Sequence, residues 1–312
     1  MDSPLASERN REFLCESIFN REGPFFHVYT SHSVTEVLFG AIEDIRFVIN
    51  VIGYYSYILK VRIVAFAVMS THIHILYADS KNKASEHICS SIDKLCKYLR
   101  TKGIDALSSS IAPSFVGISS LKQFRDELAY ILRNPFVARS DVNLFSSPYT
   151  SGYLYFNSQL DSLVSEPFDS VTIRRKREML KQRDLLPCPG LRVRNGTVEP
   201  ESFVDYKLAE SLFPDARKYV MWMMKSLESQ VEIARSRGEN PLLNDDEVLS
   251  IVFRLCRESF GVDKVRMLTS LQRQELAQTL KRHYGASNKQ IMRCLSLPPE
   301  TVDAMFPLSS RP

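Results

Sequence analysis

His72 and His74 are the residues from which chemistry can first be argued, because two imidazoles stand one residue apart. They lie in a stretch, Met69–Leu76, with the apolar, β-branched composition of a buried strand. Side chains at positions i and i+2 of a strand share a face, so both imidazoles are expected on one surface, as two metal ligands would be. The simpler alternative is a pair of strand histidines, one satisfied by hydrogen bonds and the other facing solvent.

Tyr130 and Asn134 form a second pair, four residues apart in a segment predicted as a helix over 121–133. Residues with this spacing lie on one helix face, so a phenol could attack a phosphate while an amide oxygen reaches a metal held by the histidines. Taken alone, Tyr130 is typical of a half-buried core tyrosine, and Asn134, before Pro135, of a helix end. The occurrence of all four residues in this order favours the chemical interpretation.

The elements that would position these residues follow a β-α-β-β-α-β order with one helix added. Alternation and helical spacing predict strands at 24–31, 58–68, 71–78 and 114–118 and helices at 35–52, 85–100 and 121–133. This is the order of the ferredoxin-like split β-α-β arrangement, an α+β fold whose antiparallel sheet carries helices on one face.

The rest of the chain divides by composition. We expect an N-terminal arm at 1–23, a domain at 24–157 that carries the two histidines and Tyr130, a basic linker at 158–200 and a helical domain at 201–312 that could bind DNA. In that last part, Ser287 and Gln290 have the spacing of a capping box. Two short helices follow across a tight turn at Ser296-Leu297, which predicts a helix-turn-helix.

Basic residues gather in two places that could contact DNA phosphates. A charge run is most often a solvated helix face, and the alternative is sequence-independent phosphate contact. The first place lies in the linker and the second in the short helix 288–295; the residues concerned are Arg174, Arg175, Lys176, Arg177, Lys289 and Arg293.

The overall composition permits DNA as a partner without requiring it. The net charge is +4, with 44% hydrophobic and 24% charged residues. The six cysteines are scattered without a Cys-x-x-Cys pair, which indicates reduced thiols and no zinc site. No apolar run is long enough to span a bilayer and the N-terminus is unlike a signal peptide, so we expect a cytoplasmic protein with no membrane partner.

The motifs resemble those of a known family of DNA-processing enzymes. His72-Ile73-His74 matches the histidine–hydrophobic–histidine core of HUH endonucleases, and the segment from Tyr130 to Pro135 is similar to the tyrosine helix of the REP-associated tyrosine transposases. The resemblance covers about residues 24–157 and departs from the family at Thr71, where asparagine is usual, and after Pro135, where Phe136-Val137-Ala138 keeps only the alanine. Further similar segments are Phe26–Thr30, Ala65–Met69, Tyr149–Gly152 and Tyr155–Asn157.

The resemblance implies a metal-dependent endonuclease and strand transferase acting in DNA transposition or repeat mobilisation. Tyr130 would be the nucleophile that forms a 5′-phosphotyrosine link. His72, His74 and Asn134 would bind Mg²⁺ or Mn²⁺, with Mn²⁺ favoured by the softer imidazole ligands. The substrate would be single-stranded or hairpin DNA, and the protein would act as a monomer or a homodimer. His27 and His32 are expected to be structural.

Two other functions remain open from the sequence. The first is a catalytically silent regulator that binds DNA hairpins and derives from such a transposase. The second is a replication initiator or relaxase with the same metal chemistry, although these often place the histidines and tyrosine in another order. Tyr98, the nearest alternative nucleophile, lacks a matching ligand.

Overall fold

The chain forms two compact units, and each is described by itself. The computed structural model describes residues 4–30, 38–69, 72–104, 111–138, 149–160, 164–224, 245–284 and 286–307. The first unit contains most of the chain up to Met223 and the second contains Met224–Pro312. No helix in these ranges is both long enough and apolar enough to cross a membrane.

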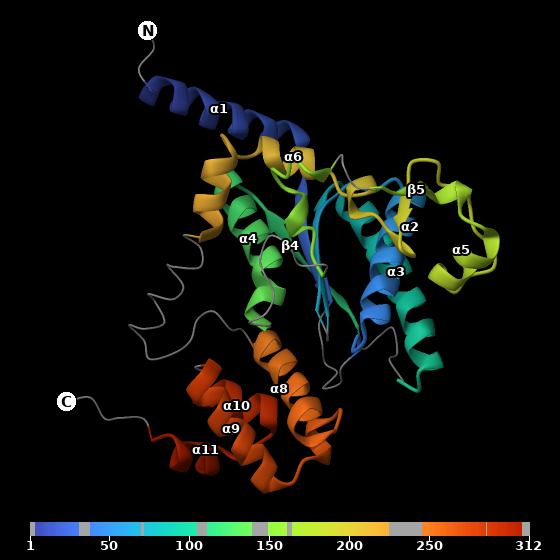
Figure 1. The fold of residues 1–312 in the computed structure, drawn as a ribbon. Coiled ribbons are helices and arrows are strands. Elements are labelled where there is room, and N and C mark those ends of the chain that lie inside the picture. The colour runs from blue at the N-terminus through green and yellow to red at the C-terminus, as the bar shows by residue number, and fades with distance from the viewer. Residues whose placement is uncertain are drawn as a thin grey trace. The chain divides into compact units, whose positions relative to one another are not determined.

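A four-stranded antiparallel sheet organises the first unit, in the spatial order β2-β3-β1-β4 (Figure 1). This order confirms the predicted α+β fold with a ferredoxin-like sheet. The strands are β1 (Phe25–Thr30), β2 (Ile63–Val68), β3 (Ile73–Ala78) and β4 (Pro113–Ile118), and the helices between them are α2 (Ile42–Ile58) and α3 (Lys81–Thr101).

The two faces of β3 pack against different elements. Tyr77 points toward α2 and α3, because its hydroxyl bonds His87 of α3, and Ile73 and Ile75 share that face by alternation. His74 therefore points to the opposite face of the sheet. The strand is buried on both sides, which explains its nearly continuous apolar composition.

The opposite face of the sheet is covered by α4 (Leu121–Ala138) and α1 (Pro4–Glu22) (Figure 1). Three rings join them: Phe25 of β1 stacks on Phe19 of α1 at 5.0 Å between centroids and meets Phe124 of α4 edge-on at 5.0 Å. The predicted arm thus contains a long helix packed on this face. Helix α4 also continues through Pro135 to Ala138, past the end predicted for it at residue 133.

The segment predicted as a basic linker, 158–200, is folded into the first unit. A small sheet of β5 (Glu166–Pro167), β6 (Arg192–Arg194) and β7 (Thr197–Val198) accompanies helix α5 (Ile173–Leu180). Asn195 and Gly196 have φ of 52° and 78°, the left-handed pair of residues that joins a two-residue hairpin. The side chain of Asn50 in α2 fixes this hairpin, accepting from Val198 N at 2.6 Å and donating to Gly196 O at 3.1 Å.

The first unit also extends beyond the predicted boundary at residue 200. Helix α6 (Tyr206–Ser211) and a further helix over 216–224 follow, and Tyr219 is buried against Tyr155, Phe156 and Phe213. The boundary falls near Met223 because these aromatic contacts join the helices to the sheet domain. Single turns of 3-10 helix occur at Gly152–Leu154, Phe168–Ser170, Pro200–Ser202 and, in the second unit, Val265–Met267.

The second unit is helical and has its own core. Its apolar side chains pack around Ile251, Leu280, Ile291 and Val302, one from each helix. Ser287 and Gln290 form the predicted capping box, and Ser296 ends the third helix in the left-handed region with φ of 50°. The helices are α8 (Asp245–Phe260), α9 (Ser270–Tyr284), α10 (Asn288–Leu295) and α11 (Pro299–Met305).

Candidate active site

His72 and His74 meet on the face of the sheet that α4 covers. His74 lies in β3 opposite Tyr29 of β1, and His72 immediately precedes the strand. Their Nε2 atoms lie 2.8 Å apart, and each residue is only 1% exposed. The two imidazoles therefore converge on one buried point, as the alternation of the sequence predicts.

The spacing of these two nitrogens fits a shared metal ion. Ligand atoms about 2.1 Å from one ion and at right angles to each other lie about 3 Å apart, so a shift of a few tenths of an ångström would admit an ion. Among the described residues, no group of three His, Cys, Asp or Glu side chains could hold a metal. A metal bound by the two histidines would therefore need a ligand of another kind, and the sequence offers the Asn134 amide, whose side chain lies outside the described part of the chain.

Tyr130 lies beside the histidine pair. Its ring centroid is 5.5 Å from that of His74, at an interplanar angle of 89°. The buried guanidinium of Arg133, one turn later in α4, lies over the Tyr130 ring with Cζ 5.2 Å from the centroid. The structure thus brings together three of the four residues proposed for the chemistry. Asn134 lies in α4, but its side chain falls outside the described part of the chain.

Two residues that the motifs did not single out extend the site. His27 Nε2 lies 2.9 Å from His74 Nδ1, and His27 Nδ1 lies 2.8 Å from a carboxylate oxygen of Glu127. His27 was expected to be structural, whereas its ring is also 5.9 Å from that of Tyr130. One signal in the sequence could have indicated Glu127: it precedes Tyr130 by three residues, so both lie on one face of α4.

The basic residues of α5 are largely paired with carboxylates. Arg174 bonds Glu178, Arg175 bonds Glu166, and Lys176 lies 3.8 Å from an Asp169 oxygen. The pairs made by Arg174 and Arg175 are exposed and therefore weak, so these two residues could exchange their carboxylates for DNA phosphates, whereas Lys176 is mostly buried. Arg177 donates to the Arg183 carbonyl at 3.2 Å and is exposed.

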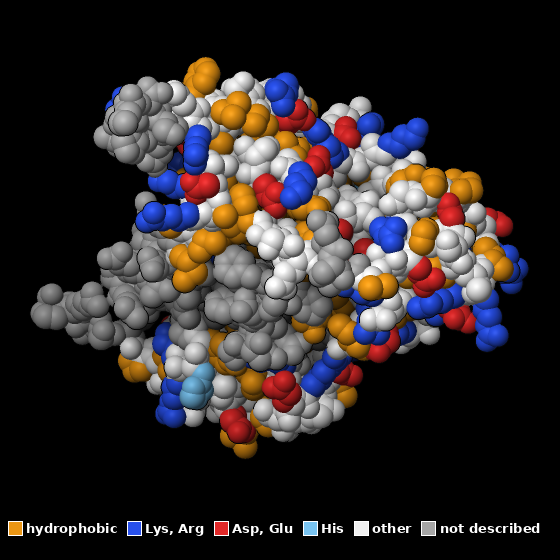
Figure 2. Space-filling model, turned by 45° about the horizontal axis from the view of Figure 1, so that its top comes forward, with side chains coloured by type: hydrophobic (Ala, Val, Ile, Leu, Met, Phe, Trp, Pro, Cys, Tyr) orange, Lys and Arg blue, Asp and Glu red, His pale blue; other side chains and the backbone are white. Residues whose placement is uncertain are grey.

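Among the described residues on the face drawn in Figure 2, lysine and arginine side chains are interspersed with acidic ones and form no continuous basic field. In the second unit, Lys289 and Arg293 are both exposed and, four residues apart, share a face of α10. Helix α11 carries Glu300 and Asp303 and has no lysine or arginine. Any electrostatic attraction of the predicted helix-turn-helix for phosphate therefore resides on α10 rather than α11.

A second group of titratable side chains, next to β6 and β7, is structural. Arg194 donates to both oxygens of the buried Glu199, each at 2.8 Å. Burial and the neighbouring Glu201 carboxyl raise the Glu199 pKa to about 7 against the pull of Arg194. Because Arg194 is held by this carboxylate, it is not available to DNA.

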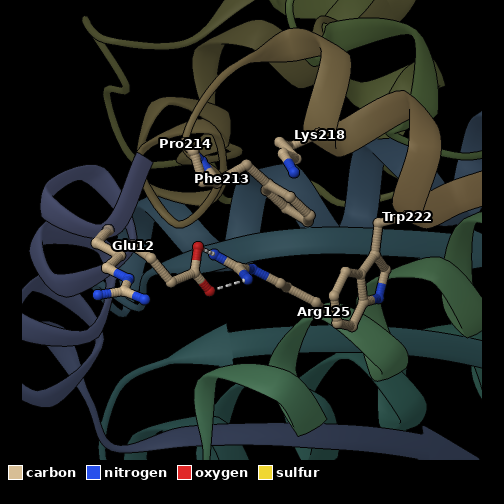
Figure 3. Close-up of a pocket in the computed structure, with 7 residues that line it drawn as sticks. Glu12, Arg125, Phe213, Pro214, Lys218 and Trp222 are labelled. Carbon is tan, nitrogen blue, oxygen red and sulfur yellow. Dashed lines mark hydrogen bonds and ion pairs between the residues drawn. The ribbon is translucent and has the colours of Figure 1, made fainter. Parts of the chain in front are cut away.

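A pocket of about 270 Å³ lies on another side of α4, around Arg125 (Figure 3). The Arg125 guanidinium is bidentate to Glu12 of α1, at 2.6 and 3.2 Å, and its Nε donates to the Leu212 carbonyl at 2.8 Å. It also lies over the rings of Phe213 and Trp222. All these partners are internal, so Arg125 ties α1, α4 and the helix over 216–224 together.

Comparisons of the chain with protein-family models, with curated proteins and with solved structures find no match. The function is therefore inferred from the geometry of the histidines and Tyr130 and from the motifs that carry them.

Proposed function

We propose that the chain is a metal-dependent single-stranded DNA endonuclease and strand transferase of the single-tyrosine HUH type. The observation that carries this proposal is the convergence of the His72 and His74 Nε2 atoms, 2.8 Å apart, beside the Tyr130 ring. A structural histidine pair needs no phenol next to it, whereas a phosphotyrosine mechanism needs both.

In the proposed reaction the Tyr130 hydroxyl attacks a DNA phosphate. A bond forms between the phenol oxygen and phosphorus, the bond from phosphorus to the 3′ oxygen breaks, the phenol proton is lost and the departing 3′ oxygen gains one. The product is a 5′-phosphotyrosine and a free 3′-hydroxyl. Because the link keeps the phosphodiester energy, the reverse attack by a 3′-hydroxyl can join strands without a nucleotide cofactor.

His72 and His74, with the Asn134 amide, would hold Mg²⁺ or Mn²⁺. Bound there, the ion would act as a Lewis acid on a non-bridging phosphate oxygen. The residues of the chain have their own tasks: the imidazoles fix the position of the phosphate, and packing against His74 fixes the Tyr130 ring. Arg133, whose charge lies over that ring, supplies a cation close to where the phosphate would lie.

One observation favours a second candidate, a catalytically silent protein that binds DNA hairpins. Both metal-site histidines are almost fully buried, and a closed site gives a phosphate no direct path to them. An enzyme would have to open this site on binding DNA, whereas a regulator would not. Covalent chemistry separates the two candidates.

The test is a covalent-adduct assay with hairpin DNA from the repeats that flank the gene. A label at the 3′ end should appear on the protein in a denaturing gel with Mn²⁺ and be absent with EDTA. Tyr130→Phe should abolish the labelled band while hairpin affinity is retained. Tyr98→Phe is the matched control, because that phenol donates to Asp44 on the other face of the sheet and should leave the band unchanged. Tight hairpin binding by the wild type without any band would support the silent regulator.

A further inference from the structure

A hydrogen-bonded chain runs from the half-buried Glu127 through the buried His27 and His74 to the buried His72, which is more than a metal site of two histidines requires. Three hydrogen-bond distances join its members: 2.8 Å from Glu127 to His27, 2.9 Å from His27 to His74 and 2.8 Å from His74 to His72. All three imidazoles are at most 3% exposed, so water does not compete for their nitrogens. Both ring nitrogens of His27 and both of His74 therefore have a defined partner within the chain.

The carboxylate at one end determines where the protons lie. A carboxylate only accepts, so the Nδ1 of His27 must carry a proton and donate it to Glu127. In a neutral imidazole the other nitrogen is then an acceptor, so His27 Nε2 accepts from His74 Nδ1–H. His74 Nε2 is consequently left with its lone pair, and this is the nitrogen that faces His72.

The two proposed ligands are thus prepared differently. His74 already has the tautomer that a metal needs, with Nδ1 protonated and Nε2 open. His72 Nε2 faces that lone pair at 2.8 Å, so in the metal-free protein it carries the proton and donates to His74. Metal binding would then require His72 to move its proton from Nε2 to Nδ1, whereas His74 would change nothing.

We infer that His27 and Glu127 are positioning residues that fix His74 in its metal-binding tautomer and orientation. A hydrogen bond from the second nitrogen of a metal-bound imidazole to a carboxylate or another acceptor raises ligand basicity and fixes the ring. Here the carboxylate acts through an intervening imidazole. The inference rests on the proposed function, because it assigns a role toward the same metal.

The strands and helix account for the assembly of this chain. The register of β1 and β3 pairs Tyr29 with His74 and His27 with Leu76, so His27 is the diagonal neighbour of His74 on the same sheet face. Phe25, two residues earlier on that face, packs on Phe124 of α4. This contact holds α4 against β1, and Glu127, one turn later, then reaches His27.

The first test is made on the wild type without metal. In the full chain labelled with ¹⁵N-histidine, long-range ¹H–¹⁵N spectra should show His74 protonated at Nδ1 and His72 at Nε2. Addition of diamagnetic Mg²⁺ should move the His72 proton to Nδ1 and leave the His74 tautomer unchanged. A metal-free His74 protonated at Nε2 would overturn the inference.

The second test measures Mn²⁺ affinity from the electron paramagnetic resonance signal of the free ion. Glu127→Leu should weaken binding by about 10- to 100-fold, the usual effect of losing such a partner. Glu127→Gln keeps an oxygen acceptor and should retain more affinity than Glu127→Leu. Asp126→Asn is the control, because it removes a charge from the residue just before Glu127 in α4. The Asp126 side chain contacts Trp222 and Lys122, so this variant should bind Mn²⁺ as the wild type does.

The outcomes separate this inference from the proposed function. Wild-type Mn²⁺ affinity in Glu127→Leu would overturn the inference and leave the endonuclease proposal intact. If Glu127→Leu clearly loses Mn²⁺ affinity while the wild type forms no DNA adduct, the inference is supported and the endonuclease proposal is not. No Mn²⁺ binding by the wild type would overturn both.

Discussion

His87 gives the sharpest prediction for stability, because it is a fully buried histidine with both nitrogens bonded. It lies in α3, where its Nε2–H donates to the Ile52 carbonyl at 3.0 Å and its Nδ1 accepts from the Tyr77 hydroxyl at 2.8 Å. This arrangement satisfies both nitrogens of the neutral imidazole. A second proton, on Nδ1, would have no contact with solvent. Burial lowers the His87 pKa from its ordinary 6.5 to about 4.

The sign of the pH effect follows from this lowered pKa. The unfolded chain takes up the proton near pH 6.5 and the folded protein only near pH 4, so unfolding is favoured between these values as the pH falls. The stabilisation is fully present above pH 6.5 and is lost toward pH 4. Since one pKa unit corresponds to about 1.4 kcal/mol, lowering the pH from about 7.5 to about 4.5 should remove about 2.5 kcal/mol through this one group.

Urea unfolding at these two pH values, followed by tryptophan fluorescence, measures this effect. The chain has one tryptophan, Trp222, which lies in the first unit with His87, so the signal reports unfolding of that unit. The wild type minus His87→Gln difference in unfolding free energy should shrink by about 2.5 kcal/mol at the lower pH. His283→Gln, at an exposed histidine of the second unit, should show no such change. If the difference in unfolding free energy between the wild type and His87→Gln does not vary with pH, then burial does not lower the His87 pKa and this prediction is wrong.

Three further substitutions test particular contacts. Arg125→Ala removes the bidentate partner of the half-exposed Glu12 and the donor to the Leu212 carbonyl, and should cost about 1–3 kcal/mol of unfolding free energy in the fluorescence assay; an unchanged stability would contradict the role given to Arg125. Gly53→Ala places a Cβ 2.8 Å from the Phe203 ring and should cost about 1–3 kcal/mol, and an unchanged stability would mean that α2 and this ring can separate freely. Ser287→Ala removes the cap of α10 and should cost about 1 kcal/mol, seen by circular dichroism as a lower midpoint of the second unit alone; loss in the first unit instead would contradict the division of the chain.

The sequence predicted the strands and the histidine pair well because both depend on alternation. In β3, the apolar Ile73 and Ile75 face one side and His74 the other, and the structure has the same alternation. The register between β1 and β3 could not be predicted, since it depends on long-range pairing. For that reason the contact of His27 with His74, from positions far apart in the chain, was missed.

A linker at 158–200 was wrongly expected because the prediction used the charges of this segment and overlooked its turn residues. Asn195-Gly196 between alternating residues is a hairpin signal, and Val193 and Val198 are its buried positions. The acidic partners of the basic residues could be predicted only in part. Arg175 finds Glu166 only after the chain has folded back, which no local pattern shows.

The most direct test of the proposed chemistry is the mass of the peptide that contains Tyr130. After incubation with Mn²⁺ and single-stranded hairpin DNA, the protein is digested with trypsin and nuclease and examined by mass spectrometry. The account predicts that this peptide carries a nucleotide joined through a phosphate to the Tyr130 oxygen, and that EDTA abolishes the product. A DNA-linked peptide from elsewhere in the chain, or cleaved DNA with no linked peptide, would contradict it.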